Sequence, residues 1–543
     1  MSSKPTDPAQ PDAAQSSPDA AQAGPGSLLR STSVVSGMTL LSRVLGLLRD
    51  VVFARIFGTS LVMDAFIVAN RIPNMLRRFF AEGAFSQGFV PVMARFRERH
   101  TEEEAQEFVD AIAGTLGLIL FGVTLAGVIA APILVAVVAP GFVGDDGRFD
   151  LATLMLRFTF PYLLFVSLTA FAGGILNTYG RFAVPAFTPV LLNVVLIAGA
   201  VWLSPRLAEP GMALAYAVFA AGCVQLIFQL PFLAAIGRLP RPRWRPAHEG
   251  VRRVGNLMLP AIFGSSVAQI NVLLGGVIAS LLGVGKISLL YYSDRLMELP
   301  LGLFGIALAT VTLPTLSRQF ASGSNAEFAK TLDWSMKLVV LVAVPSAVGL
   351  IVLAEPLIAG IYYGGEFGAE DVGLAALSLQ AFAVGLIGFS FVKILAPAYF
   401  AREDTRTPVR YALVALAVNF VLSVVLSMWL HRQGFAGTHA GLALAISVAA
   451  LVNAYLLYRG LRGDGYVQHQ PGWLRLMSKF GLANAVLAGG LIGIGRPLEW
   501  WLAMGVVPRA GWLLAYVAGG AALYFTTLLI LGVRPSVLRV NNA

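Results

Sequence analysis

Residues 42–82 read SRVLGLLRDVVFARIFGTSLVMDAFIVANRIPNMLRRFFAE, an apolar sequence interrupted by charged side chains. The charged residues are six arginines and three acids: Arg43, Arg49, Asp50, Arg55, Asp64, Arg71, Arg77, Arg78 and Glu82. The apolar runs predict membrane-embedded helices, in which a charge at the bilayer centre costs about 2.5–3.5 kcal/mol. Such charges either reach an interface or line a water-filled cavity. If they line a cavity, the excess of arginine indicates an anionic ligand, with phosphate as the best fit.

The composition of the whole chain agrees with this interpretation. Of its 543 residues, 57% are hydrophobic and only 13% are charged, which predicts an all-α polytopic membrane protein. The net charge of +10 does not indicate a nucleic-acid partner, because the basic residues lie mostly in loops between apolar spans. The single cysteine, Cys223, excludes a disulfide within one chain, and the five histidines show no metal-ligand spacing. We therefore expect neither a cofactor nor a metal site.

About fourteen apolar segments are long enough to cross the roughly 30 Å of hydrocarbon in a bilayer. Their approximate limits are 33–57, 62–82, 108–139, 152–176, 185–203, 211–236, 256–282, 287–313, 335–362, 375–398, 409–430, 438–458, 480–498 and 511–533. Alternate loops differ in charge: one set holds most of the basic residues, whereas the other holds the acidic Asp145-Asp146. The positive-inside rule then predicts that both termini are cytoplasmic.

The chain repeats itself about every 223 residues. Arg71-Ile72 is echoed by Arg295-Leu296, and Pro185 by Pro408. Because each copy holds six spans, both copies have the same orientation, which predicts two parallel lobes with a substrate path between them. The predicted organisation is a disordered tail at 1–29, an N-lobe at 30–236, a basic cytoplasmic loop at 237–255, a C-lobe at 256–460 and a C-terminal helix pair at 461–543.

The charged residues differ in how strongly they indicate a site. Arg43 lies in the middle of a span with no acid three or four residues away, which favours a functional role. For Arg77 and Arg78 there is an alternative to a binding site: their side chains could extend to lipid phosphates at the membrane interface. Arg295 and Glu298 are spaced to form an ion pair on one helix face, which is compatible with structure or with function.

Other charges are more compatible with structural roles. Asp50 and Arg55 fit structural roles better than ligand binding. Lys393 lies near the end of a span, where a lysine that extends to the interface is the favoured interpretation.

Several motifs resemble those of the MurJ (MviN) family of lipid II flippases, which belongs to the MOP exporter superfamily. They are SRVLG at 42–46, RD at 49–50, FG at 57–58, DAF at 64–66, PNMLRR at 73–78, AEGAFSQ at 81–87, YYSDRLME at 291–298 and LPTLS at 313–317. The resemblance extends over nearly all of the chain after residue 30, whereas the N-terminal tail has no counterpart.

The resemblance implies a fourteen-helix transporter, not an enzyme, in the bacterial inner membrane. It implies that lipid II, the undecaprenyl-diphosphate precursor of peptidoglycan, moves from the inner to the outer leaflet by alternating access. The substrate-binding residues would be Arg43, Arg49, Asp64, Arg77, Arg78, Arg295 and Glu298. It also implies a groove for the lipid tail at the C-terminal helix pair. Membrane lipids and proteins of cell-wall synthesis or division would be further partners, and the membrane potential or a monovalent cation would drive transport.

Two other classes of protein share part of this pattern. Another MOP exporter, either a polysaccharide-lipid flippase or a drug/cation antiporter, would have the same fold. An antiporter that exports cations should, however, carry more acids than arginines in its spans, and the first two spans show the opposite. A membrane glycosyltransferase that uses lipid-linked sugars would need catalytic acids, often in a large outer loop, and the outer loops here are short.

Overall fold

The computed structural model of the chain describes residues 25–78, 84–468 and 472–533. The regular structure in these ranges is helical, apart from one isolated β-bridge between Gly364 and Phe367. The predicted all-α class is therefore confirmed. Residues 1–24 of the predicted tail lie outside the described ranges, and the first helix within those ranges, α2, begins at Pro25. Residues 534–543, at the end of the predicted C-terminal pair, also lie outside them.

The first half of the chain forms the helices up to the basic loop. They are α2 (Pro25–Phe57), α3 (Leu61–Arg77), α4 (Ala84–Arg99), α5 (Glu102–Ile129), α6 (Ala131–Val138), η2 (Pro140–Phe142), α7 (Asp146–Thr159), α8 (Tyr162–Thr178), α9 (Ala183–Ala198), η3 (Gly199–Leu203), η4 (Ser204–Arg206) and α10 (Met212–Ala235).

The second half forms the remaining helices, several of which are longer. They are α11 (Glu249–Ser280), α12 (Lys286–Ala321), α13 (Asn325–Val352), α14 (Ala354–Tyr362), α15 (Ala369–Phe400), α16 (Arg406–Arg432), α17 (Thr438–Gly463), α18 (Trp473–Gly493), α19 (Leu498–Leu502) and α20 (Val506–Ile530).

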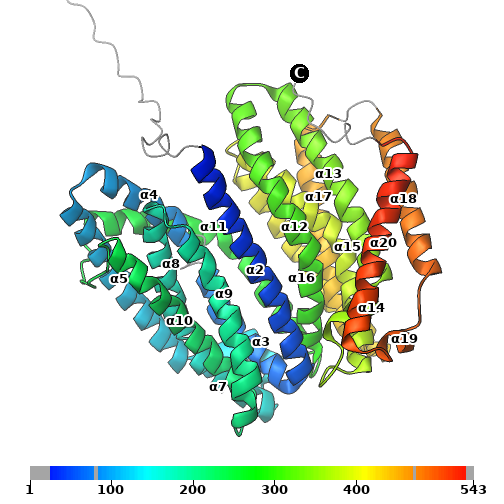
Figure 1. The fold of residues 1–543 in the computed structure, drawn as a ribbon, viewed down its shortest axis with the longest axis horizontal. Helices are drawn as coiled ribbons and strands as arrows, with labels where there is room; N and C mark the ends of the chain where they lie inside the picture. The colour runs from blue at the N-terminus through cyan, green and yellow to red at the C-terminus, as the bar shows by residue number, and fades with distance from the viewer. Residues whose placement is uncertain (1–24, 79–83, 469–471, 534–543) are drawn as a thin grey trace, which may run out of the picture.

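A tight corner separates α2 from α3 and folds the charged stretch back on itself. Gly58 adopts a φ of +58° there, a left-handed conformation that favours glycine. Ser60 then caps α3 by accepting a hydrogen bond from the Met63 N–H at 3.4 Å. The charges at 43–78 consequently lie on two helices that run in opposite directions (Figure 1).

The helices pack in two groups. In the first group α10 packs on α8 and α9, α2 on α9, and α3 on α7. In the second group α15 packs on α12, α13 and α17, while α18 and α20 pack together beside α13. Helix α11 contacts both groups, through α4 on one side and α16 on the other. The two groups meet near the α2–α3 corner and spread apart toward the end at which α2 begins (Figure 1).

Ten helical segments of the described chain are long and apolar enough to cross a membrane. These ten segments match ten of the fourteen predicted spans. The other four predicted spans, at 33–57, 62–82, 256–282 and 287–313, correspond to α2, α3, α11 and α12, which are not among the ten. Helix α3 has only 17 residues, and α2 carries several of the charges that opened the sequence analysis. The fold is therefore that of an all-helical, multi-span membrane protein.

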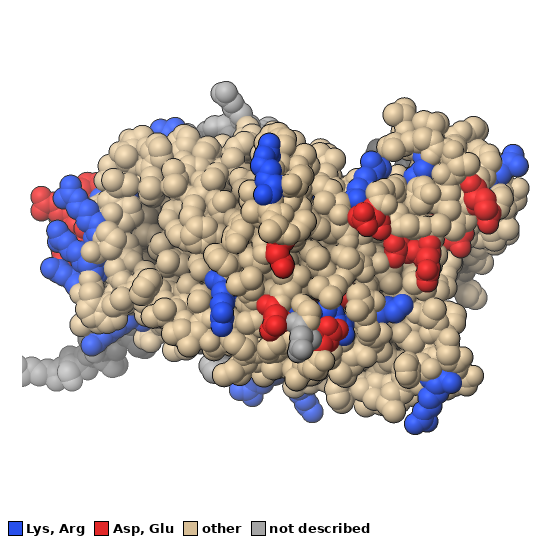
Figure 2. Space-filling model, turned by 90° about the horizontal axis from the view of Figure 1, so that it is seen from below, with Lys and Arg blue, Asp and Glu red and all other residues tan. Residues whose placement is uncertain are grey.

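The outer surface of the helices is apolar. Large side chains such as Phe121, Trp202 and Trp429 are more than half exposed. In water such a surface would promote aggregation, but hydrocarbon is its natural solvent. Figure 2 looks onto the end of the molecule at which α2 and α3 meet, and there acidic and basic side chains are interspersed on a mostly uncharged surface.

Candidate substrate-binding cavity

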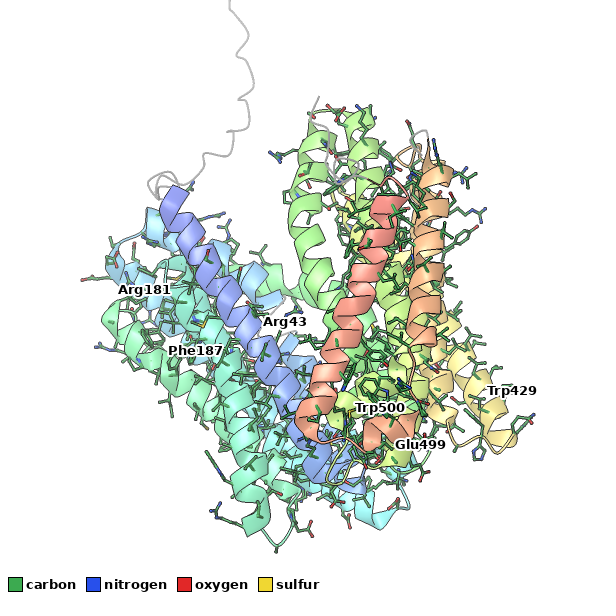
Figure 3. All side chains as sticks on the ribbon, turned by 45° about the vertical axis from the view of Figure 1, so that its right-hand side comes forward. Arg43, Arg181, Phe187, Trp429, Glu499 and Trp500 are labelled. Carbon is green, nitrogen blue, oxygen red and sulfur yellow. The ribbon has the colours of Figure 1, made fainter. Side chains whose placement is uncertain are left out.

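A cavity of about 380 Å³ lies between the two groups of helices. Its lining comes from α2, α12 and α15, and comprises Arg43, Gly46, Leu47, Arg49, Asp50, Arg295, Glu298, Leu299, Leu301, Gly302 and Lys393. Four of the predicted site residues, Arg43, Arg49, Arg295 and Glu298, are therefore brought together here. Figure 3 shows Arg43 partway along α2, beside the second group of helices.

Asp50 is the centre of the charged network in this cavity. Its Oδ1 atom accepts hydrogen bonds from Arg49 Nη2 at 2.7 Å and from the Tyr291 hydroxyl at 2.8 Å. Its Oδ2 atom lies 3.8 Å from Arg295 Nε on α12. Asp50 is only 2% exposed, so these charges interact in a region of low dielectric constant. One carboxylate thus joins arginines from α2 and α12.

A buried amide fixes the position of the Arg49 guanidinium. Arg49 Nη1 donates to Asn193 Oδ1 on α9 at 3.0 Å, and Asn193 Nδ2 donates to the Ser42 carbonyl at 3.1 Å. Asn193 is buried, so its own orientation is restricted. Arg49 is therefore held between α9 and Asp50 before any ligand binds, which reduces the entropy that ligand binding would cost.

Arg295 forms the ion pair that its spacing predicts. Its Nη1 atom lies 2.8 Å from Glu298 Oε2, and its guanidinium stacks 4.9 Å from the centre of the Tyr291 ring. The side chain remains 37% exposed, and that of Glu298 50% exposed. Both groups can therefore exchange these partners for a ligand that enters the cavity.

Lys393 also lines the cavity, so its interpretation as a lysine that extends to the membrane interface is wrong. It projects from α15, and its Nζ atom donates to the Leu301 carbonyl at 3.4 Å. The lining residues together carry four cations and two carboxylates, a net charge of +2. A ligand with about two negative charges is complementary to this lining.

Three predicted site residues lie outside the lining of this cavity. Asp64 is fully buried and accepts hydrogen bonds from Gly285 N at 2.6 Å, Ser288 N at 2.9 Å and Ser288 Oγ at 2.6 Å. It therefore binds the first turn of α12. Arg77 donates from Nε to Asn74 Oδ1 at 2.9 Å within α3, and Arg78 is exposed at the end of that helix.

Further contacts join the two groups near Asp64. Thr59 Oγ1 donates to Asp371 Oδ1 at 2.5 Å, and the Glu366 N–H donates to the Arg55 carbonyl at 3.0 Å. The Tyr292 hydroxyl donates to the Gly58 carbonyl at 3.2 Å. The α2–α3 corner is thus hydrogen-bonded to the second half of the chain, and this closes that end of the molecule.

Sequence reasoning missed Asn193 and Tyr291, and it undervalued Asp50 and Lys393. Tyr291 stands in the YYSDRLME motif beside Arg295, which was an available signal. Asn193 is a single amide in the apolar run of α9, and a polar residue buried at membrane depth indicates a specific partner.

Comparison with known proteins identifies the family. Residues 53–507 match the family described as lipid II flippase MurJ. A probable lipid II flippase MurJ from Vibrio cholerae is 45% identical, over 93% of this chain and 97% of that protein. The lipid II flippase MurJ from Burkholderia cenocepacia is 41% identical, over 94% of this chain and 99% of that protein.

Solved structures agree with these sequence matches. A lipid II flippase MurJ in an inward closed conformation superposes with a TM-score of 0.75 at 25% identity, covering 93% of this chain and 99% of that one. A multidrug transporter of the MATE family, in the MOP superfamily, superposes with a TM-score of 0.64 at 14% identity, over 80% of this chain and 98% of its own, and at that identity it shows the fold alone. The chain belongs to the MurJ family of lipid II flippases.

Proposed function

We propose that this chain moves lipid II from the inner to the outer leaflet of the bacterial inner membrane, and that the cavity cations hold the diphosphate during transfer. The observation that carries the proposal is the net charge of +2 on the cavity lining. A diphosphate in a lipid-linked sugar carries about two negative charges, and arginine donates to phosphate oxygens in pairs. Arg43, Arg49 and Arg295 are the arginines that line the cavity in this state.

Asp64, Arg77 and Arg78 do not line the cavity in this structure, so we propose a different role for them. We infer that they contribute to the site in another conformation, because α3 and the first turn of α12 would separate when the Asp64 hydrogen bonds break. Asp64 would then control access to the site, whereas Arg77 and Arg78, at the end of α3, would meet the head group as it enters.

We propose that four further helices also cross the membrane, which gives fourteen spans with both termini in the cytoplasm. Helices α2 and α12 line the charged cavity, so their charges face water rather than lipid, and an apolar composition is not required of them. An even number of spans and the basic residues of the loop between α10 and α11 support the cytoplasmic termini.

The proposed lobes are the repeats at 30–236 and 256–460, joined by the basic loop and followed by the helix pair at 461–543. A pair of hydrogen bonds supports the repeat. Arg49 on α2 bonds Asn193 on α9, and near the equivalent positions of the second half, offset by 222 (271 − 49) and 226 (419 − 193) residues, Asn271 on α11 accepts from Asn419 on α16 at 2.7 Å. A polar contact thus joins the proposed counterpart helices at similar places in the two halves, which supports the repeat.

A second cavity supports the proposed route for the lipid tail. It has a volume of about 440 Å³, and its mostly apolar lining comes from α12, α13, α14, α18 and α20. Leu299 lines both this cavity and the charged one. A lipid could therefore place its diphosphate among the cations while its tail remains in an apolar environment, which avoids transfer of the tail through water.

We propose that transport proceeds by alternating access and that this structure is the state closed at the α2–α3 corner. The hydrogen bonds of Asp64, Thr59 and Tyr292 support closure at that end. An inside-negative potential favours outward movement of an anion by about 2.3 kcal/mol per charge per 100 mV. We therefore propose the membrane potential as a driving force. The alternative is coupling to a monovalent cation. Transport that depends on sodium or on protons at zero membrane potential would identify that coupling.

Cation export of the antiporter type is disfavoured by the same cavity, since its cations outnumber its acids. Depletion of the protein in its native cell tests the proposed function. We expect lipid II to accumulate in the inner leaflet. If lipid II still reaches the outer leaflet at the normal rate after depletion, and no second flippase is present, the proposed function is wrong.

A further inference from the structure

The four cations of the charged cavity are of two kinds. Arg49 and Arg295 already have carboxylate partners, Asp50 and Glu298. Arg43 and Lys393 form no ion pair within the described parts of the chain. The net positive charge of the cavity therefore resides on these two residues, so they are the cations with most to gain from an incoming anion.

Both of these cations contact the same turn of α12. Lys393 Nζ donates to the Leu301 carbonyl at 3.4 Å. The guanidinium of Arg43 lies against the neighbouring Gly302, where a Cβ atom would overlap Nη1 and would lie 3.0 Å from Cζ and 3.2 Å from Nη2. The Arg43 side chain thus occupies the volume that a side chain at position 302 would fill.

Two like charges at such a site repel each other. Glu298 attracts Lys393 across the cavity, but no carboxylate of the described residues forms an ion pair with Arg43 or with Lys393. Both cations lie against the α12 backbone, Lys393 through its hydrogen bond to the Leu301 carbonyl and Arg43 through its close approach to Gly302. This arrangement suits a ligand that is itself a compact anion, because a phosphate group can accept hydrogen bonds from a guanidinium and an ammonium at once.

We propose that Gly302 is a positioning residue, which holds Arg43 beside Lys393 to form a subsite for one phosphate of the diphosphate. The proposal rests on the proposed function, which it makes more specific. Arg49 and Arg295, arranged around Asp50, then face the other phosphate. Gly302 itself contributes no charge and no hydrogen-bonding side chain; its contribution is the absence of a side chain.

A methyl group added at position 302 would overlap Nη1 of Arg43. That atom is the far end of a flexible arginine, so the guanidinium moves and the helix backbone does not. Alanine is also preferred over glycine within a helix. The Gly302→Ala variant should therefore fold at least as well as the natural chain while its Arg43 guanidinium is displaced by about 1 Å, a shift large enough to impair a binding site.

The test measures lipid II binding to the full-length protein in detergent by native mass spectrometry, together with the melting temperature. We expect Gly302→Ala to weaken binding roughly tenfold, because the displaced guanidinium loses one charge-assisted hydrogen bond to the phosphate. Gly275→Ala on α11 is the matched control, since a Cβ atom there meets nothing within 4 Å. This control should bind normally, and neither variant should melt at a lower temperature.

A double-mutant cycle separates positioning from a general effect on structure. If Gly302 acts through Arg43, adding Gly302→Ala to Arg43→Ala should cause no further loss of binding. Normal binding by Gly302→Ala, or a loss that adds fully to that of Arg43→Ala, would overturn the proposal. If Arg43→Ala itself binds lipid II normally, the cationic cavity of the proposed function fails instead.

Lys393→Met tests the other cation of the subsite independently of the glycine. It keeps the length of the side chain and removes its charge. We expect weaker binding of lipid II with an unchanged melting temperature. Unchanged binding would remove Lys393 from the subsite, and this result remains informative even if Gly302→Ala proves unstable.

Discussion

Asp50 sets the electrostatics of the cavity at the scale of single residues. It is almost fully buried and lies between Arg49 and Arg295, which come from different helices. Without it, two guanidinium groups would face each other at low dielectric constant. Asp50 thus places one negative charge between the two arginines, where a diphosphate would add its own.

Asp50→Asn should make this role visible. The variant keeps the shape of the side chain but leaves the arginines without their shared charge, so we expect stability to fall by roughly 1–3 kcal/mol. Lipid II supplies negative charge at the same place, and it should therefore raise the melting temperature of the variant more than that of the natural chain. Thermal unfolding with and without lipid II measures both effects; an equal or smaller ligand shift in the variant would contradict this account.

At the residue level, the charges that interrupt apolar runs in the sequence include several that line the cavity, and their binding of substrate stays a prediction. Arg43, Arg49 and Arg295 were identifiable because an isolated cation in hydrocarbon requires an explanation. The partners that orient them were not, because Asn193 is uncharged and lies far away in sequence. The sequence analysis placed Asp64 among the substrate-binding residues. In the structure its carboxylate instead accepts hydrogen bonds from backbone amides at the start of α12. This contact joins the two halves of the chain, and no local sequence pattern predicts it.

At the scale of helices, capping groups define where the elements begin. The first turn of α11 is capped by His248, whose Nδ1 atom accepts a hydrogen bond from the Gly250 N–H at 3.1 Å. The imidazole lies 5.9 Å from the rings of Phe96 and Phe108. This burial, together with the nearby Arg245, lowers the pKa of His248 below its ordinary value of 6.5.

The cap should therefore depend on pH. Only the neutral imidazole can accept this hydrogen bond. Because the pKa is lower in the folded state, the stabilising contribution is complete above pH 6.5 and is lost as the pH falls through the folded-state pKa. Hydrogen exchange of residues 249–252 should be faster at pH 5 in the natural chain than in His248→Asn at the same pH, since asparagine caps without titrating. Equal exchange in the two proteins would exclude the mechanism.

Turn residues mark the helix limits in this sequence, whereas hydropathy marks only the crossings. The corner at Gly58 follows from its sequence. The predicted span at 108–139 instead divides into α5 and α6 at Ala130, and that at 152–176 contains a break between α7 and α8 next to Pro161. Both breaks lie beside a proline, Pro132 in the first turn of α6 and Pro161 before α8, which is a signal that hydropathy alone does not detect.

At the scale of the whole molecule, the proposed topology makes a prediction about access from each side of the membrane. In a Cys223→Ala background, single cysteines at Asp145 and Glu366 should react with an impermeant maleimide added to the outside, after the outer membrane is permeabilised. A cysteine at Arg241, in the basic loop, should react only after the inner membrane is opened. Labelling of all three from the same side would contradict fourteen spans with cytoplasmic termini.

The two-sided distribution of charge connects this topology to transport. Cations from α2 in the first half and from α12 and α15 in the second half surround one cavity. A movement of one half relative to the other would therefore change the shape of the whole cavity, as alternating access requires. The sequence repeat predicted that such a cavity lies between the halves, whereas the selection of Lys393 and Gly302 as its lining depended on how α15 and α12 approach each other in three dimensions.

The most direct measurement is the appearance of lipid II in the outer leaflet of cells whose only lipid II flippase is this chain or a variant of it. Arg181→Ala serves as a control, since Arg181 is exposed and lies outside the cavity lining. We predict that this control transports normally, whereas Arg295→Ala at equal protein level accumulates lipid II in the inner leaflet. Transport by Arg295→Ala at the natural rate would contradict the claim that the cavity cations carry the diphosphate.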